Sequence, residues 1–137
     1  MYLSVVKDLY NNEIVAYSMS QNNDTVLVSD TMEKLYMLDI KPNYILHTDQ
    51  GFQYTRSEYL SQVREYNIIP SMSRKGNCRD NSPVEVFFSH LKSETTNNIG
   101  ELKRKIEDYI WFYNNERIQI KTGMEPMQNK DIIFIVY

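Results

Sequence analysis

The chain of 137 residues has the length of one domain and the composition of an ordinary globular protein, with 42% hydrophobic and 24% charged residues. Its net charge of −3 argues against a uniformly basic DNA-binding domain, although carboxylates gathered at a metal site would also lower the total. The single cysteine, Cys78, excludes an internal disulfide and a cysteine-based zinc site, and we expect a cytoplasmic protein without a membrane span.

The first half of the chain predicts alternating strands and helices. In chain order, the expected elements are a β-hairpin in residues 2–20, a helix capped by Asn23 or Asp24, a buried strand at residues 44–47, a helix at about 55–66 and a short strand at 68–69. Pro70 is expected to stop the last strand, because proline has no backbone N–H to donate.

The second half begins with a polar and basic segment, residues 71–81, which contains Gly76. We expect residues 74–81 to form a loop that is more mobile than the elements around it. Two helices are expected to follow, from Ser82 to about Thr95 and from Glu101 to Glu116. The whole pattern predicts one α/β domain with a mixed sheet covered by helices.

Two carboxylates stand out among the acidic residues. Asp49 directly follows the buried strand, and Glu85 falls in the first turn of the helix that begins at Ser82. Brought to one edge of the sheet, they would supply the oxygen ligands that Mg²⁺ prefers, as phosphoryl transfer requires. Each also has a purely structural explanation. Asp49 would close an Asx turn, and Glu85 would complete a capping box with Ser82.

The sequence around these carboxylates forms a joint pattern. Residues 50 to 84, 35 in number, separate Asp49 from Glu85. The flanking segments are HTDQGFQY (residues 47–54) and DNSPVEVFFSHLKSE (residues 80–94). Further blocks are YLSVVKDLY (2–10), IVAY (14–17), YNNER (113–117) and GMEP (123–126). In this order, from about Tyr2 to Met127, the chain resembles the integrase core of insertion-sequence transposases related to retroviral integrases.

The resemblance implies a ribonuclease-H-like fold and DNA transposition by Mg²⁺- or Mn²⁺-dependent strand cleavage and transfer. Asp49 and Glu85 match the second and third metal-binding carboxylates of the family. Lys92 matches a basic position that would contact the DNA backbone, with an ordinary solvated lysine as an equal alternative. The basic residues that would hold phosphates, unless they belong to a solvated loop, are Arg74, Lys75 and Arg79. The implied partners are DNA (transposon ends and target) and other transposase molecules. The chain would associate either with copies of itself or with a full-length transposase.

The chain departs from the family pattern at both ends. The family's first aspartate lies on a strand before the segment that matches Tyr2, where only Met1 stands here. We therefore expect the first strand to be missing, with a sheet neighbour unpaired, the metal weakly bound and the chain inactive by itself. Asp8 is an alternative source of the missing carboxylate, but it matches the aspartate near the turn after the following strand, and we expect it to have a turn role.

At the other end, residues 128–137 form an atypical apolar tail behind a partial core of residues 1–127. The alternative to a catalytic fragment is a non-catalytic remnant that binds DNA or partner subunits.

Overall fold

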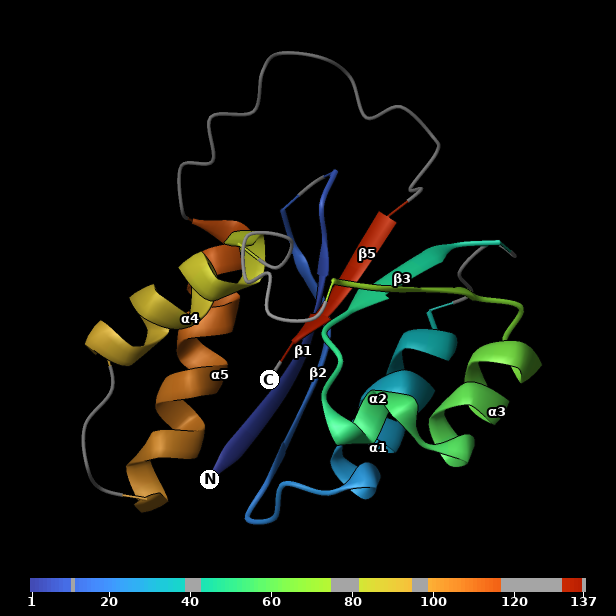
Figure 1. The fold of residues 1–137 in the computed structure, drawn as a ribbon. Helices are drawn as coiled ribbons and strands as arrows, with labels where there is room; N and C mark the ends of the chain where they lie inside the picture. Colours follow the sequence, from blue (N-terminus) through green and yellow to red (C-terminus); the bar gives the residue numbers. More distant parts are fainter. Residues whose placement is uncertain (11, 39–42, 75–81, 95–98, 117–131, 137) are drawn as a thin grey trace.

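The computed structural model describes residues 1–10, 12–38, 43–74, 82–94, 99–116 and 132–136. Helices cover both faces of one mixed sheet (Figure 1). The elements are β1 (Tyr2–Asp8), β2 (Ile14–Ser20), α1 (Thr25–Tyr36), β3 (Ile45–Thr48), α2 (Phe52–Thr55), α3 (Ser57–Glu65), β4 (Ile69–Met72), α4 (Ser82–Glu94), α5 (Ile99–Asn115) and β5 (Ile132–Val136).

Within the described residues, the sheet has five strands in the order β2-β1-β5-β3-β4. β1 runs antiparallel to both β2 and β5. β3 runs parallel to both β5 and β4. The strand that comes last in the chain therefore occupies the centre of the sheet, between strands that come first and third.

The C-terminal apolar segment is consequently part of the sheet. Residues 5–8 of β1 pair with residues 133–136, and residues 45–48 of β3 pair with residues 132–135. The expectation that a sheet neighbour would be unpaired is wrong for residues 5–8 of β1. A continuous apolar sequence such as Ile-Ile-Phe-Ile-Val is typical of a central strand with helices on both faces.

Two hydrophobic cores lie on opposite faces of the sheet. β1 supplies Val6 to the core under α1 and α3, and Leu3 and Val5 to the core under α4 and α5, because successive side chains of a strand point to opposite faces. A bulge between β1 and β2 changes this alternation in β2. As a result Ile14 and Ala16, two residues apart, belong to different cores.

The predicted hairpin and first helix are confirmed. Asp24 is the residue that caps α1, with the Leu27 N–H donating to Asp24 Oδ1 at 3.1 Å. The helix expected at about 55–66 is α3, which runs from Ser57 to Glu65. A short helix that was not expected, α2, precedes it, and Arg56 separates the two with an extended backbone (φ −77°, ψ 152°).

The prediction that Pro70 stops its strand is wrong, since β4 continues to Met72. β4 is an edge strand, where a missing N–H is tolerated. The loop predicted to be mobile lies outside the described residues, apart from Arg74. No helix in the described ranges has the length and apolar character needed to cross a membrane.

The buried Tyr59 is expected to lower the unfolding free energy of the protein at alkaline pH. Its ring packs edge-to-face on Tyr54, with centroids 5.4 Å apart, and burial raises the pKa of Tyr59 from 10.0 to about 12. The pKa of Tyr59 is higher in the folded state than in the unfolded state. The contribution of Tyr59 to the unfolding free energy is therefore complete below pH 10 and is lost as pH rises towards 12. We expect Tyr59 to account for a fall of about 2–3 kcal/mol in unfolding free energy across this window.

Urea unfolding of the protein between pH 9 and 12 measures this effect. Tyr59→Phe should make the decline shallower, whereas the control Tyr10→Phe, at an exposed position, should leave it unchanged. An equal decline in the Tyr59→Phe variant would show that other groups control alkaline unfolding.

Candidate metal and nucleic-acid site

Asp49 lies immediately beyond β3, as predicted, and is partly buried. The Gly51 N–H donates to Asp49 Oδ1 at 2.7 Å, which confirms the Asx turn. The next side chain ties the same loop to the end of β4, since Gln50 Nε2 donates to the Ser73 carbonyl at 3.0 Å. The carboxylate is therefore held in position by its own loop, with one of its two oxygens engaged by the backbone.

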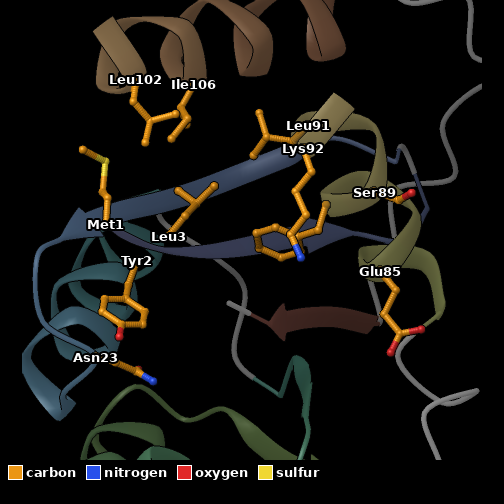
Figure 2. Close-up of a pocket in the computed structure, with 11 residues that line it drawn as sticks. Met1, Tyr2, Leu3, Asn23, Glu85, Ser89, Leu91, Lys92, Leu102 and Ile106 are labelled. Carbon is orange, nitrogen blue, oxygen red and sulfur yellow. The ribbon is translucent and has the colours of Figure 1, made fainter. Parts of the chain in front are cut away.

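Glu85 lies in the first turn of α4 and is exposed to solvent. The opposite face of α4 is anchored in the core by Val84, Phe87 and Leu91. Lys92 follows Glu85 by two helical turns and is also exposed. Figure 2 shows that the Glu85 and Lys92 side chains project from the same side of α4.

An open groove of about 730 Å³ lies beside these two charged residues. Figure 2 shows its apolar wall, formed by β1, α4 and α5, with Glu85 and Lys92 along one side. The residues that line the groove are Met1, Tyr2, Leu3, Asn23, Glu85, Phe88, Ser89, Leu91, Lys92, Leu102 and Ile106. The structure thus brings Glu85 and Lys92 together, while Asp49 stands at the end of a different element.

Carboxylate oxygens such as those of Asp49 and Glu85 suit a hard cation. Within the described residues, however, no three His, Cys, Asp or Glu side chains are gathered as a metal-binding group. That Asp49 and Glu85 face one another stays a prediction.

Two other candidate ligands have structural roles. The Tyr10 N–H donates to Asp8 Oδ1 at 2.8 Å, and the Asp8 N–H donates to the Glu13 carbonyl at 2.8 Å. The predicted turn role of Asp8 is therefore confirmed. His47 Nδ1 lies 2.9 Å from Ser71 Oγ, a contact that links β3 to β4.

Of the basic residues predicted to hold phosphates, Arg74 is exposed just beyond β4. Lys75 and Arg79 lie outside the described residues.

Two residues of the sequence block YNNER, Tyr113 and Asn114, have packing roles that the sequence alone did not reveal. The Asn114 side chain makes two hydrogen bonds to the backbone of Ile14, accepting from its N–H and donating to its carbonyl, both at 2.9 Å. The Tyr113 ring packs edge-to-face on Phe87, with centroids 5.0 Å apart, and Lys7 Nζ lies 5.5 Å from its centroid. Asn114 therefore holds α5 to the hairpin, and Tyr113 packs α5 against α4. The sequence feature that could have indicated this role is an asparagine near the end of an amphipathic helix.

Known proteins match the chain over nearly its whole length. A profile of the integrase core domain matches residues 1–78, and a second profile of the same description matches residues 85–132. The putative transposase InsK for insertion sequence IS150 of Escherichia coli (strain K12) is 41% identical over 138 residues, which cover 96% of this chain and 49% of that protein.

Other relatives agree. The transposase for IS904 of Lactococcus lactis is 37% identical, over 96% of this chain and 54% of that protein. A transposase-like protein of Haemophilus influenzae is 41% identical, over 93% and 62% respectively. The chain thus spans about half the length of the curated relatives it matches. The chain belongs to the integrase core domain family, and the curated proteins to which it is similar include insertion-sequence transposases.

Proposed function

We propose that this chain is a catalytic-core segment of a transposase, which acts in the cytoplasm on transposon ends and target DNA by metal-dependent strand cleavage and transfer. The proposed fold is ribonuclease-H-like. The supporting observation is the placement of the matching carboxylates, with β3 leading directly into Asp49 and the first turn of α4 presenting Glu85 to solvent.

Asp49 and Glu85 would hold Mg²⁺ or Mn²⁺, which when bound activates the attacking oxygen and stabilises the leaving oxygen in phosphoryl transfer. The hydrogen bond from Gly51 fixes the Asp49 carboxylate before any ion arrives. The anchored face of α4 fixes the backbone that carries Glu85. Lys92, on the same side of α4, would place a positive charge beside a phosphate of the DNA.

The shared-site proposal predicts a specific response to Mn²⁺. Titration of the ¹⁵N-labelled protein should broaden the amide signals of Gly51 and Val86 together, because a paramagnetic ion held by both carboxylates would lie near both amides. Signals near Lys105 on α5 serve as the control. Broadening at only one of the two positions would contradict a site shared by Asp49 and Glu85.

A specific observation favours the second candidate, a non-catalytic segment that binds DNA or transposase subunits. One of the two strands beside β3 is β5, and its sequence Ile-Ile-Phe-Ile-Val contains no carboxylate that could serve as a third ligand with Asp49 and Glu85. With two candidate carboxylates, Mg²⁺, which gives up its waters reluctantly, should bind weakly. We therefore propose that residues 1–137 alone do not cleave DNA at a useful rate.

A cleavage assay on DNA with IS150 ends, in Mn²⁺, distinguishes the two candidates. It compares this chain with a chimera in which residues 1–137 replace the matched segment of InsK. Cleavage by the chimera but not by the chain supports a core segment that needs the remainder of a transposase. A folded but inactive chimera would favour the non-catalytic candidate, and cleavage by the chain alone would contradict the expected inactivity.

The role proposed for Lys92 predicts a change in DNA binding. Lys92→Gln should weaken binding to duplex DNA equally for all sequences and lower the salt slope of log K by about 1, the signature of one lost phosphate contact. Fluorescence anisotropy at several salt concentrations measures both quantities. The matched control is Lys105→Gln, since Lys105 pairs with Glu101 on α5 at 3.9 Å. Equal slopes for the two variants would make Lys92 an ordinary surface lysine.

A further inference from the structure

The central strand β5 joins two parts of the sheet. Among the described strands, β1 pairs with β2 and β5, and β3 pairs with β4 and β5. No direct pairing between β1 and β3 occurs in this part of the chain. The space between β1 and β3 is therefore a strand-binding slot, defined on one side by residues 5–8 and on the other by residues 45–48.

Among the described residues, β1 extends beyond the part that pairs with β5. β1 has seven residues, of which residues 5–8 pair with β5 and residues 2–4 pair with β2 only, within the described strands. Residues 2 and 3 also line the open groove shown in Figure 2. Within the described residues, the pairing of β5 therefore reaches Val5, and the groove adjoins β1 beyond that point.

The connection to β5 is long. Fifteen residues, 117–131, separate the last described residue after α5 from the first residue of β5. A segment of this length reaches up to about 50 Å. A domain of this size has a radius of gyration of about 14 Å, so the connection is long enough to deliver β5 to the slot of a neighbouring molecule.

We propose that the slot binds β5 either from its own chain or from a second copy of this chain, so that copies exchange their C-terminal strands. A second copy carries the identical strand, which therefore pairs with residues 5–8 and 45–48 in the same register. Exchange preserves every strand pairing. The free energies of the monomer and of the strand-exchanged assembly therefore differ only by the entropy of the connecting segment and the entropy of association. The balance is set by the effective concentration of the tethered strand, which is on the order of 1 mM for short linkers and falls as the linker lengthens.

Disulfide trapping in the full-length chain tests this exchange in a Cys78→Ser background. One chain carries Val5→Cys and the other carries Val136→Cys, positions that lie opposite one another in β1 and β5. A second pair uses Val6→Cys and Ile135→Cys. Hydrogen-bonded and non-hydrogen-bonded positions alternate, so one of these pairs has the Cα separation of about 4.5 Å at which a disulfide forms.

The two single-cysteine chains are unfolded together, refolded at about 10 μM and about 1 mM, and oxidised. We expect a disulfide-linked heterodimer that is scarce at the lower concentration and abundant at the higher one. The off-register control combines Val5→Cys with Ile133→Cys, since residue 133 lies opposite Asp8. Two doubly substituted single chains serve as positive controls, one with Val5→Cys and Val136→Cys and the other with Val6→Cys and Ile135→Cys. The one whose pair has the suitable Cα separation should form an internal link at either concentration.

Heterodimer from a register-matched pair, with little from the off-register pair, supports exchange. Equal heterodimer from matched and off-register pairs would indicate non-specific association and overturn the proposal. Internal linkage in the doubly substituted chains without any heterodimer at about 1 mM would also overturn it. The same holds if neither doubly substituted chain forms an internal link, because β5 would then not occupy the slot.

Discussion

In the InsK chimera, Asp49→Asn and Glu85→Gln should each lower the transposition frequency by about 100-fold or more, since a metal ligand supplies several kcal/mol of transition-state stabilisation. Both changes remove a negative charge and nearly preserve side-chain shape. The amide oxygen that Asp49→Asn introduces can still accept the hydrogen bond from Gly51, which separates the loss of a ligand from the loss of the turn. A genetic transposition assay with an IS150-ended marker measures the frequency.

The control for these variants is Asp108→Asn, an exposed acidic residue on α5. It should leave transposition within about twofold of the parent chimera, because a surface substitution away from the site has little effect. An active chimera that tolerates both Asp49→Asn and Glu85→Gln would rule out these residues as metal ligands.

A second large effect is expected at the centre of the sheet. Phe134 lies opposite Lys7 of β1 and His47 of β3, so its backbone is flanked by strands on both sides. Phe134→Pro should lower the unfolding free energy by about 3 kcal/mol more than Phe134→Ala, because proline removes a backbone donor from a central strand. Urea unfolding followed by far-ultraviolet circular dichroism provides both values.

The alanine variant is the matched control, since it removes the same side chain without removing the N–H. Equal destabilisation by the two substitutions would mean that the backbone of residue 134 contributes no pairing. The tolerance of Pro70 in the edge strand β4 shows why the position in the sheet decides the cost.

Local sequence signals predicted most of the elements but not the sheet's central strand. The hairpin follows from alternating apolar residues around a turn, where Asn12 has a positive φ of 57°. Residues 132–136 form a short apolar run without a period that could separate a strand from a tail. Its partners in β1 lie more than 120 residues earlier, and no local pattern specifies such a pairing.

The candidate site was predictable to a similar degree. The strand before Asp49 and the helix turn that carries Glu85 follow from local patterns, and both are present. The sequence allowed two interpretations of Asp49, a turn residue and a metal ligand. The two are compatible, because the carboxylate can accept the Gly51 N–H with one oxygen and offer the other to an ion. The relative placement of the two carboxylates depends on tertiary structure, including the segment 75–81 that connects β4 to α4, which sequence periodicity does not determine.

The central position of β5 also has a consequence for the order of folding during synthesis. A ribosome releases β1, β2, α1, β3, α3 and β4 before the residues that join the two parts of the sheet exist. Pairing between Val5 and Val136 brings together residues from nearly opposite ends of the chain, a contact of high sequence separation that slows folding. The nascent chain therefore carries unpaired strand edges on β1 and β3 until translation reaches β5, an interval in which chaperones or other strands have access to them.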